Sequence, residues 1–359
     1  MEQWLKAWLP TKKRLSRNAR RSYESHIRLY LNRYLGAVRL DKLRVAHVAD
    51  MFEQIAEHNE QIAAARASKD QERWEAVKWQ CPVGPSSMQR IRETLRAALN
   101  DAIREELLTV NAAKWVEMPP AERPKPLVWT PQRVAHWRAT GDVPSPVMVW
   151  TPVQTGQFLH HAISDRLCPL FHLIAHCGLR RGEGRGLRWI DTHLEDGTID
   201  VLNQLVQYGW ETGQAKPKTD ESEATVALDA GTVTALRDHQ VRQGVQRLAA
   251  GEKWVASGLV FTQLDGSPLH PADVTERFQF LAREAGLPPI RLHDLRHGAA
   301  TLALAAGVDM KVVQAMLRHA SITTTSNLYT NVLPEVARAA AEKTALIIPR
   351  ASVRRLGRG

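Results

Sequence analysis

The sequence predicts a mainly α-helical protein whose second half adds a small antiparallel β-sheet, giving an α+β domain. Three observations predict this fold class. Apolar side chains recur at helical spacing through residues 1–115, strand signals are confined to residues 186–228, and prolines gather between the two halves. The chain has 359 residues, of which 44% are apolar. It is too long for one ordinary core and fits about two domains.

The first half contains three helical stripes. Ser16 is expected to cap a helix that ends at Gly36, a second stripe runs through residues 45–55, and Pro85 begins a third helix that ends near Leu107. Residues 57–80 are strongly polar and predict an exposed helical extension or a loop. Residues 1–116 are therefore expected to form a helical N-terminal domain.

Prolines mark the boundary between the halves, at positions 119, 120, 124, 126, 131, 144, 146 and 152. Because proline has no N–H to donate and blocks helix continuation, residues 117–149 are expected to form an extended linker. The second domain is expected at residues 150–348, followed by a basic tail at 349–359.

The second domain combines a buried helix with strands. Residues 164–177 are apolar nearly all round, which predicts a buried helix that ends at Gly178. An Asp-Gly turn at 196–197 introduces a strand over residues 198–206, and a second strand covers Ala224–Leu228 after a polar turn. Helical patterns return after these strands and continue through residue 345.

The charge balance suits a polyanionic partner such as nucleic acid. Lys and Arg total 48 against 38 Asp and Glu, a net charge of +10, and residues 11–39 hold nine basic side chains with Glu24 as their one acid. A solvated helix face is the ordinary explanation of such a run, but Ser16, Asn18, Tyr23 and His26 also suit phosphate and sugar. Two basic domains on a long linker could close around a duplex as a two-domain clamp. The expected DNA-backbone contacts are Lys12, Lys13, Arg14, Arg17, Arg20, Arg21 and Arg28.

Cysteine usage and the absence of apolar runs indicate a soluble protein of a reducing compartment. Cys81, Cys168 and Cys177 form neither a CxxC motif nor a disulfide framework. The N-terminus lacks the apolar core of a signal peptide, and no stretch reaches the roughly 18 apolar residues of a membrane helix. We expect a cytoplasmic protein with no membrane association.

Candidate chemical residues begin with His293 and Arg296, which share one face of a predicted helix. A histidine beside a permanently charged guanidinium suits an anion, above all a phosphate that gains charge, although both could be ordinary surface residues. His293 and His297 also have the spacing of the two zinc ligands in HExxH. However, Asp294 replaces the glutamate, an arginine lies between the two histidines, and no third ligand follows, so we expect no metal.

Four further positions are ordinary when taken singly. Arg180 follows the helix stop at Gly178 and begins a new helix, where Glu183 either complements the helix dipole or orients Arg180. Lys218 lies in a polar turn between strands, where a solvated lysine is common. His319 closes Leu317-Arg318-His319, and Tyr329 lies in a helix that Ser321 can cap.

Taken together, these residues follow a distinctive order: Arg180, Lys218, His293-x-x-Arg296, His319 and Tyr329. In this order residues 150–340 resemble the tyrosine recombinase (phage integrase) family, and residues 1–115 are similar to that family's helical core-binding domain. The resemblance implies that Tyr329 is the nucleophile, Arg180 and Arg296 hold the phosphate, Lys218 protonates the leaving oxygen, and His293 and His319 assist proton transfer. Glu183 matches the family's supporting acid.

The resemblance implies a site-specific recombinase that cleaves and rejoins DNA through a 3′-phosphotyrosyl intermediate, with no metal, nucleotide or other cofactor. Its expected role is integration or excision of a phage or other mobile element in the bacterial nucleoid. Expected partners are double-stranded attachment sites, further copies of the chain in a tetramer, and accessory directionality or DNA-bending proteins. Residues 333–346 are expected to form a helix that packs on its own domain or on a neighbouring protomer. A type IB topoisomerase and a non-catalytic DNA-binding protein remain alternatives.

The sequence departs from the family pattern at several positions. Arg318 stands where glycine is usual, so its side chain is expected either to contact DNA or to displace His319. Glu223 and Ala224 stand where basic residues are common, and Gly184 replaces a common alanine at a helix cost of about 1 kcal/mol. Asn331 replaces a frequent histidine after the tyrosine. Only about ten residues precede the first basic helix, so we expect either simple target sites or loss of the arm-binding domain that many relatives carry.

Overall fold

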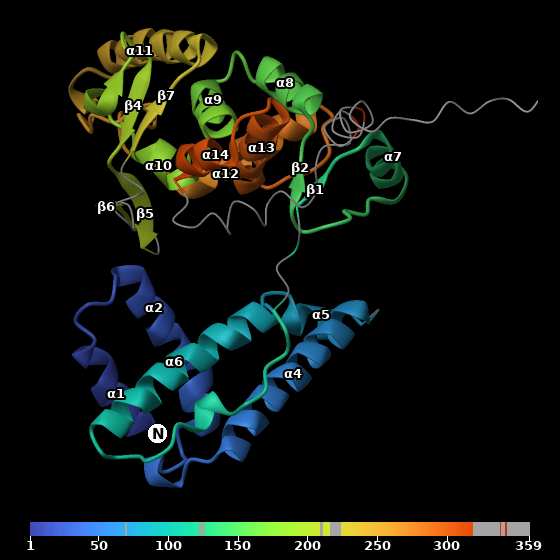
Figure 1. Ribbon diagram of the computed structural model, residues 1–359, viewed down its shortest axis with the longest axis vertical. Coiled ribbons are helices and arrows are strands. Elements are labelled where there is room, and N and C mark those ends of the chain that lie inside the picture. Colours follow the sequence, from blue (N-terminus) through green and yellow to red (C-terminus); the bar gives the residue numbers. More distant parts are fainter. Residues whose placement is uncertain are drawn as a thin grey trace, which may run out of the picture. The chain divides into compact units, whose positions relative to one another are not determined.

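The structure is a computed structural model that describes residues 1–68, 70–121, 124, 126–208, 211–215, 224–318, 338 and 342. The chain divides into two compact units, Met1–Arg123 and Pro124–Gly359, each described by itself below (Figure 1). The predicted fold class is confirmed, because the described residues are mostly helical with small sheets.

The first unit is built from helices. The predicted cap is confirmed: the Ser16 hydroxyl accepts a hydrogen bond from the backbone N–H of Ala19 at 3.3 Å and starts α2. Helix α2 continues through a π-helical turn at Ile27–Leu31 into α3, which ends before Gly36. One apolar cluster with Leu5, Leu31 and Leu95 at its centre joins these helices. The bounds in this unit are α1 Glu2–Thr11, α2 Arg17–His26, α3 Asn32–Leu35, α4 Val45–Ala67, α5 Gln71–Val77 and α6 Pro85–Arg104, with 3₁₀ turns at Leu40–Lys42 and Ala112–Lys114.

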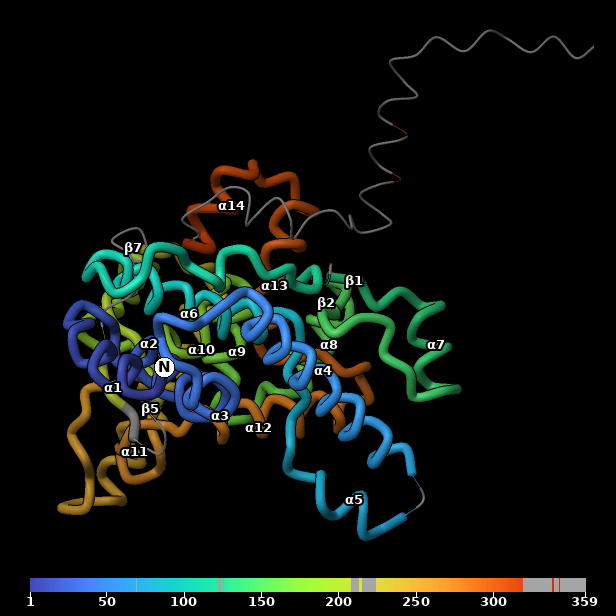
Figure 2. Tube along the Cα trace, turned by 90° about the horizontal axis from the view of Figure 1, so that it is seen from below, coloured from blue at the N-terminus to red at the C-terminus, as the bar shows by residue number. Residues whose placement is uncertain are grey.

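The polar segment 57–80 is helical over most of its length. It contains the second half of α4 and all of α5, which turns back against α4, as Figure 2 shows at the end of α4. Asp70 starts α5 because its carboxylate accepts from the N–H groups of Glu72 and Arg73. The expected helical extension is therefore present, with a short break before α5.

Much of the expected linker belongs to the second unit, so the prediction of an extended segment is wrong there. Strand β1 (Leu127–Val128) pairs in parallel with β2 (Met148–Val149), and α7 (Pro131–Thr140) lies between them. Pro131 occupies the first turn of α7, where its missing N–H has no intrahelical partner to lose. Trp129 directly follows β1 and Trp150 directly follows β2. Both are buried, and their indole N–H groups donate to the carbonyls of Pro289 and Pro288, respectively.

The second unit is built around a helical core. The predicted buried helix is α9 (Cys168–Cys177), and Gly178 ends it with a left-handed φ of 60°. Aromatic rings of Trp150, Phe158, Phe171 and Phe278 meet at centroid distances of 5.0–5.8 Å in the centre of the core. The remaining helices are α8 Pro152–His161, α10 Arg181–Gly186, α11 Ala230–Ala250, α12 Pro271–Glu284, α13 Leu292–Ala305 and α14 Met310–Leu317, with 3₁₀ turns at Trp189–Asp191 and Gly251–Lys253.

The strands after α10 form two small antiparallel sheets rather than one hairpin. Strands β3 (Thr192–His193), β4 (Thr198–Val201) and β7 (Ala224–Ala227) make the first sheet, beside α11 in Figure 1. The predicted strand over 198–206 breaks after Val201, and β5 (Gln204–Tyr208) pairs with β6 (Glu211–Ala215). The break follows from packing: β5 runs so close to α10 that a Cβ on Gly186 would lie 2.8 Å from the Cα of Gln204.

Candidate active site

The N-terminus of α10 holds the first pair of predicted site residues. Gly178 turns the chain at the end of α9, and Arg180 becomes the residue that caps α10. The backbone N–H of Arg180 donates to Oε2 of Glu183 at 2.8 Å, and its guanidinium Nη1 donates to Oε1 at 2.5 Å. Glu183 therefore caps the helix and orients Arg180 at the same time, so both expected roles are combined in one carboxylate.

Arg296 comes to the same place from α13. Its side chain is 2% exposed, and its guanidinium donates to the carbonyls of Gly178 and Leu317. Its Nη1 lies 3.9 Å from Oε2 of Glu183. The structure thus brings Arg180 and Arg296, which are far apart in sequence, to one buried carboxylate.

Arg318 completes this cluster, and sequence reasoning missed its role. It ends α14 in the left-handed conformation (φ 52°, ψ 50°), which explains why glycine suits this position. Its side chain has no exposed surface, and Nη2 lies 2.8 Å from Oε2 of Glu183. The same nitrogen donates to the Gly178 carbonyl at 3.2 Å, and Nη1 donates to the Met316 carbonyl at 2.7 Å. Of the two expectations for this side chain, a DNA contact is wrong because the guanidinium is buried, and displacement of His319 concerns a residue outside the described part of the chain.

The arginine cluster, defined here as Arg180, Arg296 and Arg318 around Glu183, carries an excess of positive charge. Three guanidinium groups face one carboxylate, so the cluster is cationic. Burial alone would raise the pKa of Glu183, but Arg318, Arg180 and Arg296 together hold that pKa below its ordinary value. The carboxylate is therefore ionised, and the excess charge suits an oxyanion.

His293 lies next to this cluster on α13. Its ring meets that of His297 edge to face, with the centroids 4.8 Å apart. Desolvation by the surrounding protein and the nearby Arg296 lower the pKa of His293, and desolvation together with His293 lowers the pKa of His297 to about 4. Both imidazoles are thus biased toward the neutral form, in which one ring nitrogen can accept a proton.

The described residues contain no group of three or more His, Cys, Asp or Glu side chains placed to hold a metal ion. Asp294, which stands at the glutamate position of HExxH, caps α13. Its carboxylate accepts two hydrogen bonds from the Arg291 guanidinium, at 2.7 and 2.9 Å. The other histidine pair, His172 and His176, stacks on α9 with ring centroids 5.3 Å apart.

Lys218, His319 and Tyr329 lie outside the described residues, as do Glu223, Asn331 and most of the helix expected at 333–346. Ala224 is described and pairs with Val201 at the beginning of β7. The structure therefore gathers Arg180, Glu183, His293 and Arg296, while the placement of the other three chemical residues stays a prediction.

Gly184 has a packing reason that the sequence did not reveal. A Cβ at this position would lie 2.5 Å from Cδ1 of Leu170 on α9, and Leu170 is fully buried. An alanine at this position would therefore require the end of the Leu170 side chain to move.

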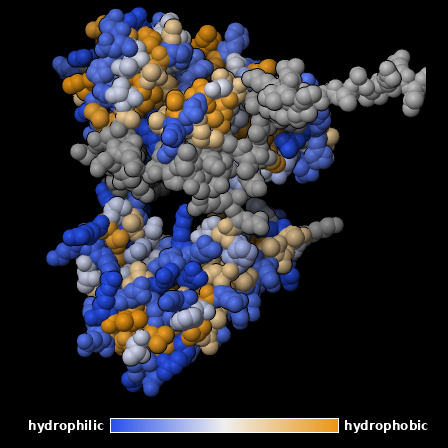
Figure 3. Space-filling view, viewed as in Figure 1, coloured by the Kyte–Doolittle hydropathy of each residue, from blue (hydrophilic) through white to orange (hydrophobic). Residues whose placement is uncertain are grey.

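The basic run in the first unit divides into two kinds of side chain. Lys12 lies over the Trp8 ring and forms an ion pair with Asp101, while Arg20 donates to the carbonyls of Leu9 and Lys12. These two basic side chains therefore make stabilising contacts within the unit. The others are exposed on a unit whose visible face in Figure 3 is largely hydrophilic: Lys13, Arg14, Arg17, Arg21 and Arg28.

The polar neighbours of this run also have structural roles. Tyr23 stacks on Trp8 with the ring centroids 5.8 Å apart, and Nδ1 of His26 lies 2.7 Å from the Thr94 hydroxyl. Ser16 caps α2, as described above. Their presence beside the arginines is thus explained by packing and capping within the unit.

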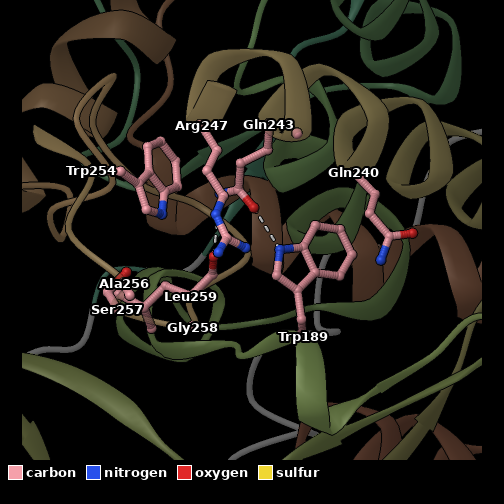
Figure 4. A pocket seen from close by; sticks show the side chains of 10 residues that line it. Trp189, Gln240, Gln243, Arg247, Trp254, Ala256, Ser257, Gly258 and Leu259 are labelled. Atoms are coloured by element: carbon pink, nitrogen blue, oxygen red, sulfur yellow. Dashed lines mark hydrogen bonds between the residues drawn. The ribbon is translucent and has the colours of Figure 1, made fainter. Parts of the chain in front are cut away.

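A pocket of about 340 Å³ lies beside α11 (Figure 4). Trp189 and Trp254 form part of its wall, and the Trp189 indole N–H donates to Oε1 of Gln243 at 2.6 Å. Arg247 and Gln240 also line it. None of these residues belongs to the arginine cluster.

A sequence profile described as the phage integrase family matches residues 154–335. The chain is 32% identical over 182 residues to a "Tyrosine recombinase XerC-like" protein of Caldanaerobacter subterraneus, covering 47% of this chain and 46% of the relative. It is 25% identical over 260 residues to the ICEBs1 integrase of Bacillus subtilis, covering 72% of this chain and 64% of that protein. The chain thus spans about half to two thirds of the length of these curated relatives.

Solved structures share the fold at low sequence identity. The Tn1549 transposon integrase in complex with transposon right end DNA has a TM-score of 0.69 at 18% identity, covering 96% of this chain and 99% of that one. A lambda integrase tetramer bound to a Holliday junction has a TM-score of 0.58 at 16% identity, covering 91% of this chain and 76% of that one.

Among the described helices, none is both long and apolar enough to cross a membrane.

Proposed function

Because the chain belongs to the phage integrase family, we propose that it is a site-specific tyrosine recombinase that cleaves and rejoins DNA through a 3′-phosphotyrosyl bond. The observation that carries this proposal is the meeting of Arg180 and Arg296 at one buried Glu183, next to His293. This arrangement concentrates fixed positive charge where a phosphate could enter.

The proposed reaction begins with attack of the Tyr329 hydroxyl on a backbone phosphate, as the imidazole of His293 or His319 accepts the phenol proton. The new P–O bond joins the tyrosine to the 3′ side, while the bond to the 5′ oxygen breaks and that oxygen takes a proton from Lys218. Because the covalent intermediate retains the energy of the broken bond, the rejoining step needs no nucleotide. The 5′-hydroxyl of the partner strand then attacks the phosphotyrosine and releases Tyr329.

Arg180, which is 36% exposed, would donate to the non-bridging oxygens, and the 2% exposed Arg296 would stabilise their developing charge from inside the protein. Removal of one such preorganised donor lowers the rate by about 10²–10³-fold. His293, whose pKa is lowered, would exchange a proton or hydrogen-bond with the phosphate, and His319 would assist it. The roles of Lys218, His319 and Tyr329 rest on the family resemblance.

We further propose that the substrate is a double-stranded attachment site of a phage or other mobile element, bound partly by the exposed basic side chains in and around α2: Lys13, Arg14, Arg17, Arg21 and Arg28. Likeness to integrases solved with transposon DNA and to a tetramer on a Holliday junction supports a homotetramer on DNA. Accessory directionality or DNA-bending proteins would act with it. The activity would take place at the bacterial nucleoid in the cytoplasm, with Met1–Arg123 and Pro124–Gly359 as the two DNA-contacting units.

A covalent-trapping experiment tests the proposal. The protein is incubated in EDTA with a nicked suicide substrate of its attachment site, and an SDS-resistant protein–DNA adduct is measured. The wild type should form the adduct and Tyr329→Phe should not. An adduct of equal yield in the Tyr329→Phe variant would overturn the proposal.

A further inference from the structure

Position 318 requires a left-handed backbone, which glycine would provide. The Arg318 side chain nevertheless makes several hydrogen bonds. With φ at 52° the residue is left-handed, a conformation that is strained for a residue with a Cβ and unstrained for glycine. Its guanidinium nevertheless contacts Glu183, Gly178 and Met316, and it has no surface exposure. The side chain therefore has a role beyond ending α14.

Two arginine side chains donate hydrogen bonds to the oxygens of Glu183, and Nη1 of a third, Arg296, lies 3.9 Å from Oε2. Oε1 is bound by Nη1 of Arg180 at 2.5 Å, and Oε2 by Nη2 of Arg318 at 2.8 Å. Of these two side chains, Arg180 is 36% exposed and Arg318 is not exposed at all. Arg180 can thus reach a ligand at the surface, while Arg318 can act only inside the protein.

A phosphate that binds Arg180 competes with Glu183 for the charge of its guanidinium, and full recruitment of Arg180 draws the group away from the carboxylate. Removing one partner of a buried ion pair is strongly unfavourable, because the remaining charge has lost both its partner and its hydration. Glu183 is 2% exposed, so water cannot replace Arg180 around it. Arg318, which contacts the carboxylate at 2.8 Å, removes most of this cost, because Arg296 lies farther away at 3.9 Å.

We propose that Arg318 is a positioning residue that serves as the resident counter-ion of Glu183, so that Arg180 can exchange this carboxylate for a DNA phosphate without leaving a buried charge unpaired. The inference rests on the proposed function. Arg318 also fixes the end of α14 relative to Arg180, since its own carbonyl accepts from Nη2 of Arg180 at 3.3 Å. His319 follows it directly in the sequence.

Arg318→Gly is the informative variant, because glycine satisfies the left-handed backbone and removes only the side chain. Arg318→Lys retains a cation, and Arg138→Gln removes the same charge from an exposed site on α7 as a matched control. The rate of adduct formation on the suicide substrate is measured at saturating DNA, together with DNA affinity and thermal stability. Each variant is also made in the Glu183→Gln background.

The adduct rate of Arg318→Gly should fall by about 10- to 100-fold while DNA affinity stays within about twofold, since the guanidinium does not reach the surface. Arg318→Lys should recover part of the rate, and Arg138→Gln should match the wild type. In the Glu183→Gln background, where no carboxylate remains to be paired, Arg318→Gly should change the rate by less than about threefold.

Two results overturn the inference. A wild-type adduct rate in Arg318→Gly means that position 318 acts through its backbone alone. An equal loss in the wild-type background and in the Glu183→Gln background means that Arg318 does not act through this carboxylate. Failure of the proposed function looks different: the wild type itself then forms no adduct, or Tyr329→Phe forms one.

Discussion

Arg180 and Glu183 are joined twice, through the backbone N–H of Arg180 to Oε2 and through its guanidinium to Oε1. The first contact caps α10 and the second aims a predicted phosphate ligand. Local helix capping and the geometry of the site are therefore set by the same carboxylate, and a change to Glu183 should affect both stability and activity.

Glu183→Gln should lower the free energy of unfolding by about 3–5 kcal/mol, because it leaves buried guanidinium groups without their anion. The adduct rate should fall at least tenfold. Urea unfolding and the suicide-substrate assay measure the two effects. The exposed Glu195→Gln is a suitable control, since its carboxylate is 90% exposed and pairs with Arg237 in a surface ion pair. Equal stability of the Glu183 and Glu195 variants would contradict the prediction.

His239 should make the stability of the second unit fall as the pH is lowered. It is 4% exposed, Nε2 lies 2.7 Å from the carbonyl of Val260, and burial lowers its pKa to about 4. Below an unfolded pKa of about 6.5 the unfolded chain binds a proton that the folded chain refuses, so stability present at pH 7 is lost between about pH 6.5 and pH 4.

The loss due to His239 should approach about 3 kcal/mol at pH 4. Urea unfolding of the wild type and His239→Gln at pH 7 and pH 4.5 measures it, and the variant should show a smaller decrease over this range. His136→Gln, which changes a largely exposed histidine on α7, should retain the wild-type decrease. The same decrease in all three proteins would count against the assignment.

Gly186→Ala should destabilise the second unit by about 1–3 kcal/mol, although alanine is the better helix former. The added Cβ would lie 2.8–2.9 Å from backbone atoms of Gln204 and Leu205, so β5 would have to move away from α10. Gly244→Ala provides the comparison, because nothing lies within 4 Å of its Cβ on α11. That variant should raise the melting temperature, while Gly186→Ala should lower it.

Lys12 and Arg14 should separate stability from DNA binding in the first unit. Lys12→Ala loses the ion pair with Asp101 and the contact with the Trp8 ring, so it should lower the unfolding free energy by up to about 1 kcal/mol. Arg14→Ala should leave stability unchanged and reduce the salt dependence of DNA affinity by about one phosphate contact. Binding isotherms at several salt concentrations and thermal melts distinguish the two. An unchanged salt slope in Arg14→Ala would remove this side chain from the DNA surface.

Residues whose signals are local could be predicted from the sequence. The Ser16 cap, the stop at Gly178 and the helix that places His293 and Arg296 on one face each depend on neighbours within a few positions. The boundary between the units was less predictable. Proline density indicated an extended linker, but buried Trp129 and Trp150 tie residues 127–150 to the core of the second unit.

The strand pairing could not be predicted from local sequence signals either. Asn203 disfavours a strand between Thr198 and Val206, but Asp200 does so too and lies inside β4, so this signal does not locate the break. The break occurs because Gly182 and Gly186 allow the backbone of β5 to approach α10, and this contact joins segments that are not neighbours in the sequence.

The sequence by itself indicated two local pairs, Arg180 with Glu183 and His293 with Arg296. Each pair is three residues apart, a spacing that brings the two side chains together at a helix start or on one helix face. It also carried the resemblance that assigns roles to Lys218, His319 and Tyr329. Only the tertiary structure decided the role of Arg318. Its partner Glu183 is 135 residues away, and whether a charged side chain faces solvent or a buried carboxylate depends on how α10, α13 and α14 pack.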